Sequence, residues 1–192
     1  MAVRNADDIL IGGGRVFIVE EQDSTKTYYD LGYMSGEFKV EEQASSQAVK
    51  ESEGGTVLTI ATDKEVRLTF NLLECNTDTL LKLNPSATEI GGSGDTTSDG
   101  KGYAVGTFQS DKTFQIELWH KKRSGNYRCI RFFKAKLSGN FTAFLINQDN
   151  ENPIAVDIVG LADESRGTER NIYEHFEVAK AEIADKVPEG GW

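Results

Sequence analysis

Few residues in this 192-residue chain have the types and spacing that catalysis or metal binding requires. Neither histidine, His120 or His175, lies three or four residues from another histidine or from a cysteine, so zinc-ligand spacing is absent. The two cysteines, Cys75 and Cys129, each lie in an apolar stretch, which favours buried, reduced thiols. A catalytic Cys75–His120 pair stays open, but only the residue types support it.

The carboxylates and glycines form no recognisable site either. The acidic residues crowd expected loops and solvent-facing positions, rather than an aromatic cleft of the kind that glycosidases use. Asp95 and Asp99 lie in a glycine-rich segment that lacks the closing glutamate of a calcium loop. Gly12, Gly13 and Gly14 lack the Lys-Ser/Thr pair of a phosphate-binding loop. We therefore expect no catalytic residue, no metal and no cofactor, and a protein that is not an enzyme.

Length and composition indicate one globular domain over residues 1–192, with 38% hydrophobic and 9% aromatic residues. Two cysteines exclude a disulfide-dense secreted scaffold. The apolar runs are too short to span a bilayer, and the first residues do not resemble a signal peptide. We expect a soluble protein that is made inside the cell and has no membrane partner.

The net charge of −10 is unevenly spread along the chain. Residues 1–100 have a net charge of −10, residues 101–140 one of +7 and residues 141–192 one of −7. The simplest interpretation is an unevenly solvated surface. The alternative is self-complementarity, in which a basic face of one copy meets an acidic face of the next. Specific nucleic-acid binding is disfavoured, because attraction to phosphates needs a dominant basic surface.

Hydrophobic periodicity predicts mostly β-strands. Residues 15–19 are β-branched or aromatic, residues 28–40 form an extended stretch broken by two glycines, and residues 66–72 alternate strictly. A short helix is expected after Asn76, ending before Pro85. The polar segment 39–55 is expected to be a surface loop, either mobile or ordered against another subunit.

The second half of the chain predicts a hairpin over residues 114–137 with its turn at 121–126, and a further strand over 154–161. His120 is expected at an exposed strand end, and residues 86–102 are expected to form a glycine-rich loop. Residues 172–178 fit either an edge strand or the start of a helix in the 166–192 tail. The pattern predicts an all-β antiparallel sandwich or partly closed barrel with one short helix.

The order of four short motifs resembles the major tail tube proteins of long-tailed bacteriophages. The motifs are ILIGGGRVFIVE at residues 9–20, YYDLGYMSGEFKVE at 28–41, EVRLTFNLLECNTDTLLKL at 65–83 and PIAVDIVGLADES at 153–165. Each motif is short, so the resemblance rests on their order and spacing across residues 9–165. The resemblance implies a structural virion protein whose rings, typically of six subunits, stack into a hollow tube that conducts the genome from capsid to host.

The resemblance also implies partners and positions. Expected partners are further copies of the chain, other tail proteins (terminator, tape measure, baseplate or sheath) and DNA in transit without specific binding; the expected location is the virion after synthesis in the host cytoplasm. Acidic residues of the first hairpin are expected to face the lumen, where they would repel DNA: Glu37, Glu41, Asp63 and Glu65. Residues expected at contacts between subunits or rings are Glu42, Gln47, Lys50, Glu51, Lys121, Lys122 and Arg123.

Two alternative functions stay open at this stage. The inner tube of a type VI-like secretion system or a bacteriocin would share the fold, and the sequence separates it poorly from a phage tube. A carbohydrate- or ligand-binding β-sandwich would use aromatic residues of the 114–137 hairpin, such as Trp119 and Tyr127. For these aromatic residues, packing in a core or an interface is the favoured interpretation.

Overall fold

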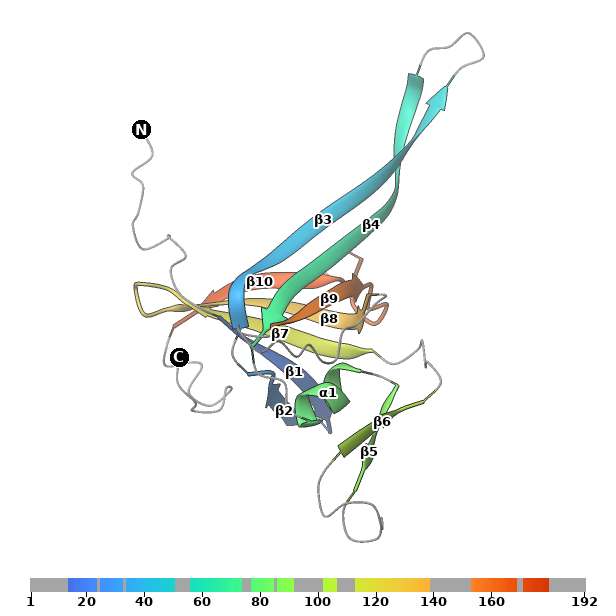
Figure 1. Ribbon diagram of the computed structural model, residues 1–192. Coiled ribbons are helices and arrows are strands. Elements are labelled where there is room, and N and C mark those ends of the chain that lie inside the picture. Colours follow the sequence, from blue (N-terminus) through green and yellow to red (C-terminus); the bar gives the residue numbers. More distant parts are fainter. Residues whose placement is uncertain are drawn as a thin grey trace.

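The computed structural model describes residues 14–23, 25–32, 34–50, 56–73, 77–84, 86–91, 102–106, 113–138, 153–168 and 171–179. Ten strands and one helix lie within these residues (Figure 1). In chain order they are β1 (Gly14–Gln22), β2 (Thr25–Asp30), β3 (Met34–Lys50), β4 (Thr56–Leu72), α1 (Thr77–Leu83), β5 (Ala87–Ile90), β6 (Gly102–Val105), β7 (Phe114–Lys121), β8 (Tyr127–Leu137), β9 (Ile154–Leu161) and β10 (Tyr173–Val178).

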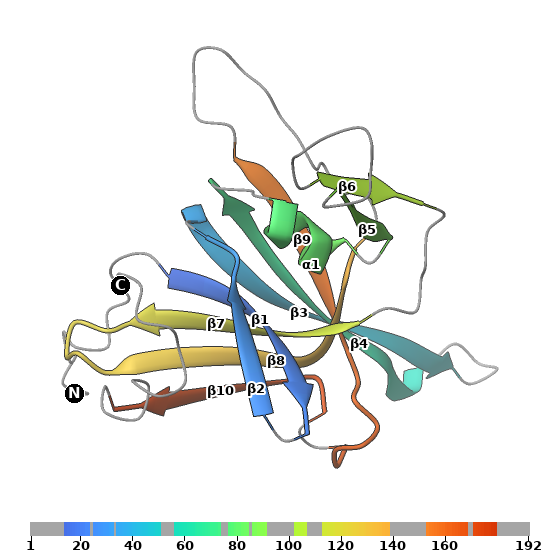
Figure 2. The ribbon, with the colours of Figure 1, turned by 90° about the horizontal axis from the view of Figure 1, so that it is seen from below.

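Eight of the strands form one antiparallel sheet. Along its main path the order is β2-β1-β7-β8-β9-β4-β3, and β10 pairs with β8 beside this path. Strand β8 uses the same edge twice, because residues 127–132 pair with β10 and residues 134–137 pair with β9. The sheet turns over at this point, so that β9, β4 and β3 cross the inner face of β1, β7 and β8 (Figures 1 and 2). The fold is therefore a two-layered β-sandwich.

Alternating side chains from both layers build the main core. Val66, Leu68, Phe70 and Leu72 point inward from β4 and are fully or almost fully buried, while the residues between them are half-exposed. They pack against inward residues of the other strands and of α1: Val16, Ile18, Leu83, Ile116, Leu118, Phe132, Ala135, Ile154, Val156 and Ile158. Burial of these side chains is the main favourable term that holds the two layers together.

The opposite face of the β1–β7–β8 layer has a second, smaller cluster. Phe17, Trp119, Tyr127 and Cys129 are each 2% exposed or less, and residues of β2 and β10 pack against them. Trp119 meets the ring of Phe176 edge to face, at 5.9 Å between ring centroids. Both faces of β7 are therefore buried, and this layer is not the usual sheet with one face in water.

The structure confirms the all-β class, the 66–72 strand, the helix after residue 76, the 114–137 hairpin and the 154–161 strand. Residues 173–178 form an edge strand, which settles that ambiguity in favour of the extended alternative. Among the described residues, the end strands β2 and β3 do not pair with each other, so the sheet does not close into a barrel.

Two expected loops are corrected. Residues 39–50 belong to strand β3 and pair with β4 as far as Lys50, so this part of the 39–55 segment is not a loop. The expected 86–102 loop contains strand β5 and the first residue of β6, which form a separate two-stranded sheet. The error has one physical cause, because polar strands that leave the core have no apolar alternation to reveal them. Residues 51–55 and 92–101 lie outside the described residues.

Candidate assembly surfaces

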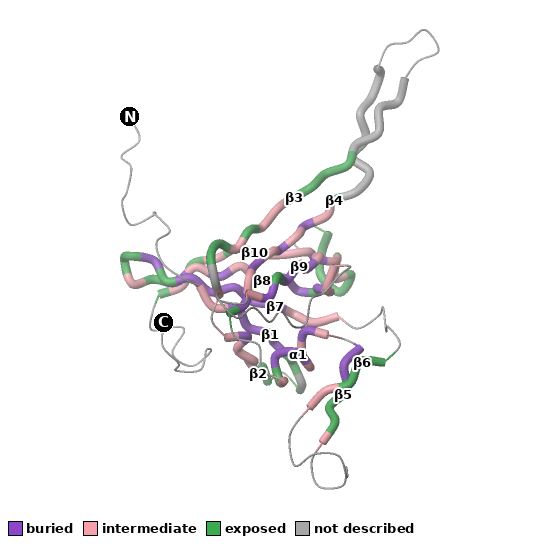
Figure 3. Tube along the Cα trace, viewed as in Figure 1, coloured by how far each residue is buried: buried purple, intermediate pink, exposed green. Residues whose placement is uncertain are grey.

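The β3–β4 hairpin extends far beyond the sandwich. Strand β9 pairs with β4 only over residues 66–72, whereas the β3–β4 ladder continues outward from Glu42↔Val66 to Lys50↔Thr56. At about 3.3 Å per residue, the outer part of β3, residues 42–50, adds about 30 Å. Figure 1 shows this arm projecting away from the sandwich, and Figure 3 shows that the described part of β3 becomes exposed as it leaves. Beyond Val66, β3 and β4 pair only with each other among the described residues, so the arm is a two-stranded ribbon.

Three of the four residues predicted to face a lumen share one surface. Glu37, Glu41 and Glu65 lie on the face of the β3–β4–β9 layer that points away from the core. Glu41 pairs with Lys39 at 2.6 Å and Glu65 with Arg67 at 2.5 Å. The side chain of Asp63 lies outside the described residues.

Cations offset the negative charge on this surface. Arg67 also contacts Asp157 of β9 at 3.5 Å. Lys134 and Lys136 of β8 pair with outward residues of β9 and lie on the same face, so four carboxylates and four cations share it. Glu41 is the main cause that raises the pKa of Lys39, through a hydrogen bond and through its charge, so Lys39 stays charged over the neutral range.

The predicted contact residues of the first hairpin divide into two groups. Glu42 points to the inner side, where its carboxylate accepts hydrogen bonds from the Tyr173 hydroxyl and from the Lys64 ammonium group, the latter at 2.7 Å. These hydrogen bonds lower the pKa of Glu42. Glu42 therefore ties β3 to β4 and β10 within one chain. The side chains of Gln47 and Lys50, and the whole of Glu51, lie outside the described residues.

The β7–β8 turn presents the basic residues of the second predicted contact. Lys121 and Arg123 are exposed, and Gly125, with φ of +88°, closes the turn through backbone hydrogen bonds between Lys122 and Asn126 and between Gly125 and Lys122. The Lys122 side chain differs, because it is only 6% exposed and its ammonium group binds Glu177 at 3.0 Å. Lys121 and Arg123 are therefore the outward-facing cations of this turn.

An acidic hollow lies at the other end of β7. It has a volume of about 750 Å³ and lies between the end of β1, helix α1, β5 and the start of β7. Lys82 of α1 binds Glu20 at 2.7 Å and lies 4.0 Å from the centroid of the Tyr29 ring. The carboxylates that line the hollow are Glu20, Glu21, Asp78 and Glu89. The chain therefore has a basic turn at one end of β7 and an acidic hollow at the other.

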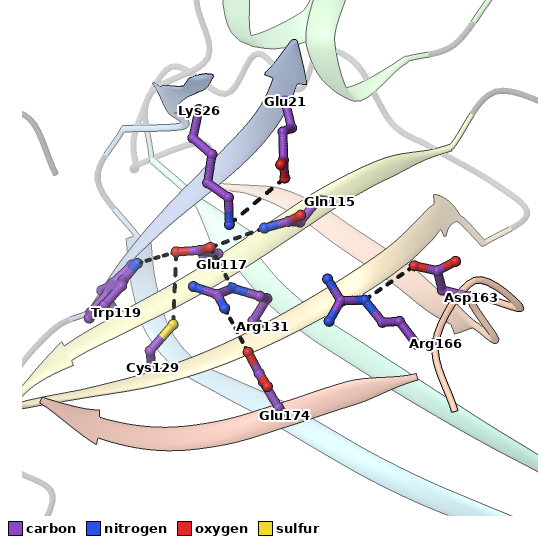
Figure 4. Close-up of polar contacts among 10 residues, drawn as sticks. All are labelled: Glu21, Lys26, Gln115, Glu117, Trp119, Cys129, Arg131, Asp163, Arg166 and Glu174. Carbon is purple, nitrogen blue, oxygen red and sulfur yellow. Dashed lines mark hydrogen bonds and ion pairs between the residues drawn. The ribbon is translucent and has the colours of Figure 1, made fainter. Parts of the chain in front are cut away.

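Sequence reasoning missed a buried ionic cluster on the outer face of β7, β8 and β10 (Figure 4). The Glu117 side chain is 0% exposed, and its carboxylate accepts hydrogen bonds from Trp119 Nε1 at 2.9 Å and from Arg131 Nε at 2.6 Å. Gln115 Nε2 adds a third hydrogen bond at 3.1 Å, and Arg131 also binds Glu174 at 2.6 Å. Glu117 joins β7 to β8, and Arg131 continues the cluster to β10 through Glu174.

The surroundings of Glu117 suppress the reactivity of neighbouring groups. Burial first, and the Glu117 charge second, raise the pKa of the Cys129 thiol well above its usual range. The same two causes raise the pKa of Tyr28 to about 12. Since the thiolate is the reactive form, Cys129 is an inert structural cysteine, in agreement with the buried thiol expected from the sequence. Cys75, the other half of the Cys–His alternative, lies outside the described residues.

The position of His120 corrects the expectation of an exposed strand end. His120 is 4% exposed, under the start of β1, where Gly14 is its register partner. A Cβ on Gly14 would lie 2.9 Å from the carbonyl oxygen of Trp119, so only glycine allows this close approach. Gly14 was the sequence signal for the burial of His120. It could not be used, because the sequence does not show that β1 pairs with β7.

The aromatic residues of the β7–β8 hairpin do not form a sugar-binding platform. Trp119 and Tyr127 are 1% and 2% exposed, so their ring faces cannot stack on a ligand. This confirms the packing interpretation. In the part of the chain that the structure describes, no group of three or more His, Cys, Asp or Glu side chains could hold a metal ion. No helix among those residues is long and apolar enough to cross a membrane.

Comparison with known proteins gives a distant structural similarity. No family model matches the chain, and no curated protein matches it. Its structure is similar to a cryo-EM structure of the anti-feeding prophage cap, described as the cap that terminates a tube, over 93% of this chain and 100% of that chain. The identity is 11% and the TM-score is 0.40. At these values the similarity carries no functional argument, and the cap's role stays with that protein.

Proposed function

We propose that this chain is a structural, non-enzymatic subunit of a phage tail tube or a related phage-tail-like tube, which assembles with copies of itself into stacked rings. The observation that carries the proposal is the β3–β4 arm, a two-stranded ribbon about 30 Å long beyond the core. A two-stranded hairpin is marginally stable in water without a hydrophobic face or a third strand to support it. The arm therefore gains its supporting surface from a neighbouring subunit.

The open sheet provides a second reason to assemble. Strands β2 and β3 end the main sheet, and unpaired strand edges invite pairing with another chain. If the edge of one subunit pairs with that of the next, a ring closes and the edges disappear, as in a barrel. The sequence resemblance implies a ring of six subunits.

The charge pattern supports head-to-tail contacts. The basic turn with Lys121 and Arg123 and the acidic hollow lie at opposite ends of β7, an eight-residue strand about 26 Å long. Complementary patches at opposite ends of a subunit generate a repeating, heterologous assembly rather than a closed dimer. We assign the first contact role to Lys121 and Arg123 rather than to Lys122, which already binds Glu177.

The outward face of the β3–β4–β9 layer is the proposed lining of the tube. It contains Glu37, Glu41 and Glu65, and two of these carboxylates already bind cations of the same face, which leaves fewer cations free to hold DNA phosphates. Partners beyond the chain itself would be other tail proteins, such as a terminator, tape measure, baseplate or sheath, and DNA in transit. The protein would then be located in the virion or particle after synthesis in the host cytoplasm.

Shortening the arm tests this proposal. Residues 45–63 are replaced by Asn-Gly, which joins the register partners Ala44 and Lys64 through a two-residue hairpin turn. The core strand 66–72 and the Glu42 contacts stay intact, so we expect a folded monomer that forms no tubes by negative-stain microscopy. Glu164→Gln, in the exposed turn after β9, is the matched control and should assemble normally. Normal tubes from the shortened variant would contradict the role of the arm.

A further inference from the structure

A cavity of about 290 Å³ lies between the two layers. Its roof is strand β3, and its floor and far wall are the inner faces of β7, β8 and β10. Apolar side chains supply much of the lining: Phe38, Val40, Leu118 and Ile130. The polar side chains that complete it are Glu42, His120, Arg128, Tyr173 and His175. The volume is at the lower end of the range for small-molecule sites.

His120 is the unexplained polar group in this wall. His120 is 4% exposed, and neither Nδ1 nor Nε2 has a hydrogen-bond partner among the residues that the structure describes. A neutral imidazole carries one donor and one acceptor, and leaving both unpaired in the interior costs free energy. Most buried polar groups in proteins are paired, so an unpaired imidazole at a cavity wall points to an occupant that bonds to it.

The charges around the cavity favour an anionic occupant. Arg128 lines the cavity and binds Glu177 at 2.8 Å, and the Lys122 ammonium group binds the same carboxylate at 3.0 Å, so two cations lie at this end of the cavity. At the opposite side, Glu42 is already bound by Lys64 and by the Tyr173 hydroxyl. The donors nearest the cavity are therefore the two imidazoles and the Arg128 guanidinium group.

We propose that the cavity binds a small organic acid that has a flat apolar body and one carboxylate. The apolar body lies between Phe38 and Val40 of the roof and Leu118 and Ile130 of the floor. The carboxylate accepts hydrogen bonds from His120 and from the Arg128 side of the wall. If water alone filled the cavity, the four apolar side chains would face water. An acid with an apolar body covers these side chains and also bonds to the polar ones.

Benzoate is the probe, and benzyl alcohol is its uncharged counterpart with a similar body. Isothermal titration on the full chain should show saturable binding of benzoate at one site, at least tenfold tighter than benzyl alcohol. In NMR spectra, benzoate should shift the His120 ring signals and give contacts between its ring protons and the methyl groups of Leu118 and Ile130. These spectra need no variant, so they test the proposal even if a substitution unfolds the chain.

Variants locate the site. His120→Phe keeps a ring but removes both nitrogens, and Val40→Trp fills the cavity from the roof; each should weaken benzoate binding at least tenfold. Arg166→Ala removes an exposed cation of the turn after β9 that does not line the cavity, so binding should stay within twofold. The proposal is overturned if binding is not saturable, if the two cavity variants bind as the original chain does, or if the His120 signals stay fixed because water alone fills the cavity.

Discussion

Replacing Glu117 by glutamine should destabilise the monomer more than any exposed charge substitution. The Glu117 carboxylate is fully buried and accepts hydrogen bonds from Trp119, Gln115 and Arg131. Glu117→Gln keeps the shape but leaves the Arg131 guanidinium group without its buried counter-ion. Breaking a buried ion pair by removing one partner costs about 3–5 kcal/mol. Because Arg131 is 20% exposed and keeps Glu174, we expect the low end, about 3 kcal/mol.

The assay is thermal and urea unfolding of the monomeric variant, followed by circular dichroism. In a chain of this length, a loss of about 3 kcal/mol lowers Tm by about 6–12 °C. Glu174→Gln is the matched control, since its side chain is 30% exposed and its loss should cost about 1 kcal/mol or less.

A double-mutant cycle separates the ion pair from general packing. Glu117→Gln combined with Arg131→Gln should cost clearly less than the sum of the single substitutions, with a coupling of about 1–3 kcal/mol. The reasoning is refuted if Glu117→Gln costs under about 1 kcal/mol, or if the two substitutions are additive within about 0.5 kcal/mol. Either result would mean that the carboxylate is not the centre that joins β7, β8 and β10.

Three further predictions concern packing, pH and reactivity. A Cβ on Gly160 would lie 2.6 Å from the Phe132 ring, so Gly160→Ala should cost about 1–3 kcal/mol in urea unfolding. The pKa of Tyr28 is raised from 10.0 to about 12, so its contribution to stability is complete below pH 10 and is lost as the pH rises to 12; Tyr28→Phe should lessen the alkaline loss. In a Cys75→Ser variant, Cys129 should react with a thiol reagent only at the rate of unfolding, and fast reaction in the folded state would contradict its burial.

The sequence was sufficient where burial on one face imposes a period of two. Val66 to Leu72, the 114–137 hairpin and the β9 strand were predicted because their apolar residues alternate over a core. The same logic failed for the outer part of β3, residues 42–50, whose sequence is mostly polar and which pairs with β4 alone among the described residues. A polar strand and a polar loop have similar compositions, so only the pairing with a neighbouring strand distinguishes them.

The site residues divide in the same way. That Glu37, Glu41 and Glu65 share a face follows from the β3–β4 pairing, which no local pattern revealed. Glu117 alternates with Ile116 and Leu118, as a solvent-facing residue would, and the ion pairs that surround it reach Glu174 of β10 through Arg131. In both cases the position of the side chain depends on contacts between different strands. Such contacts are set by tertiary packing rather than by local propensity.

The central claim is that the chain assembles with itself, and electron microscopy of the purified full chain tests it most directly. Concentrated protein at low salt should form rings or tubes of constant diameter, and assembly should weaken as salt rises, because screening separates the basic turn from the acidic hollow. A chain that stays a monomer by analytical ultracentrifugation at every concentration and salt level, with no rings or tubes in the micrographs, would contradict the account.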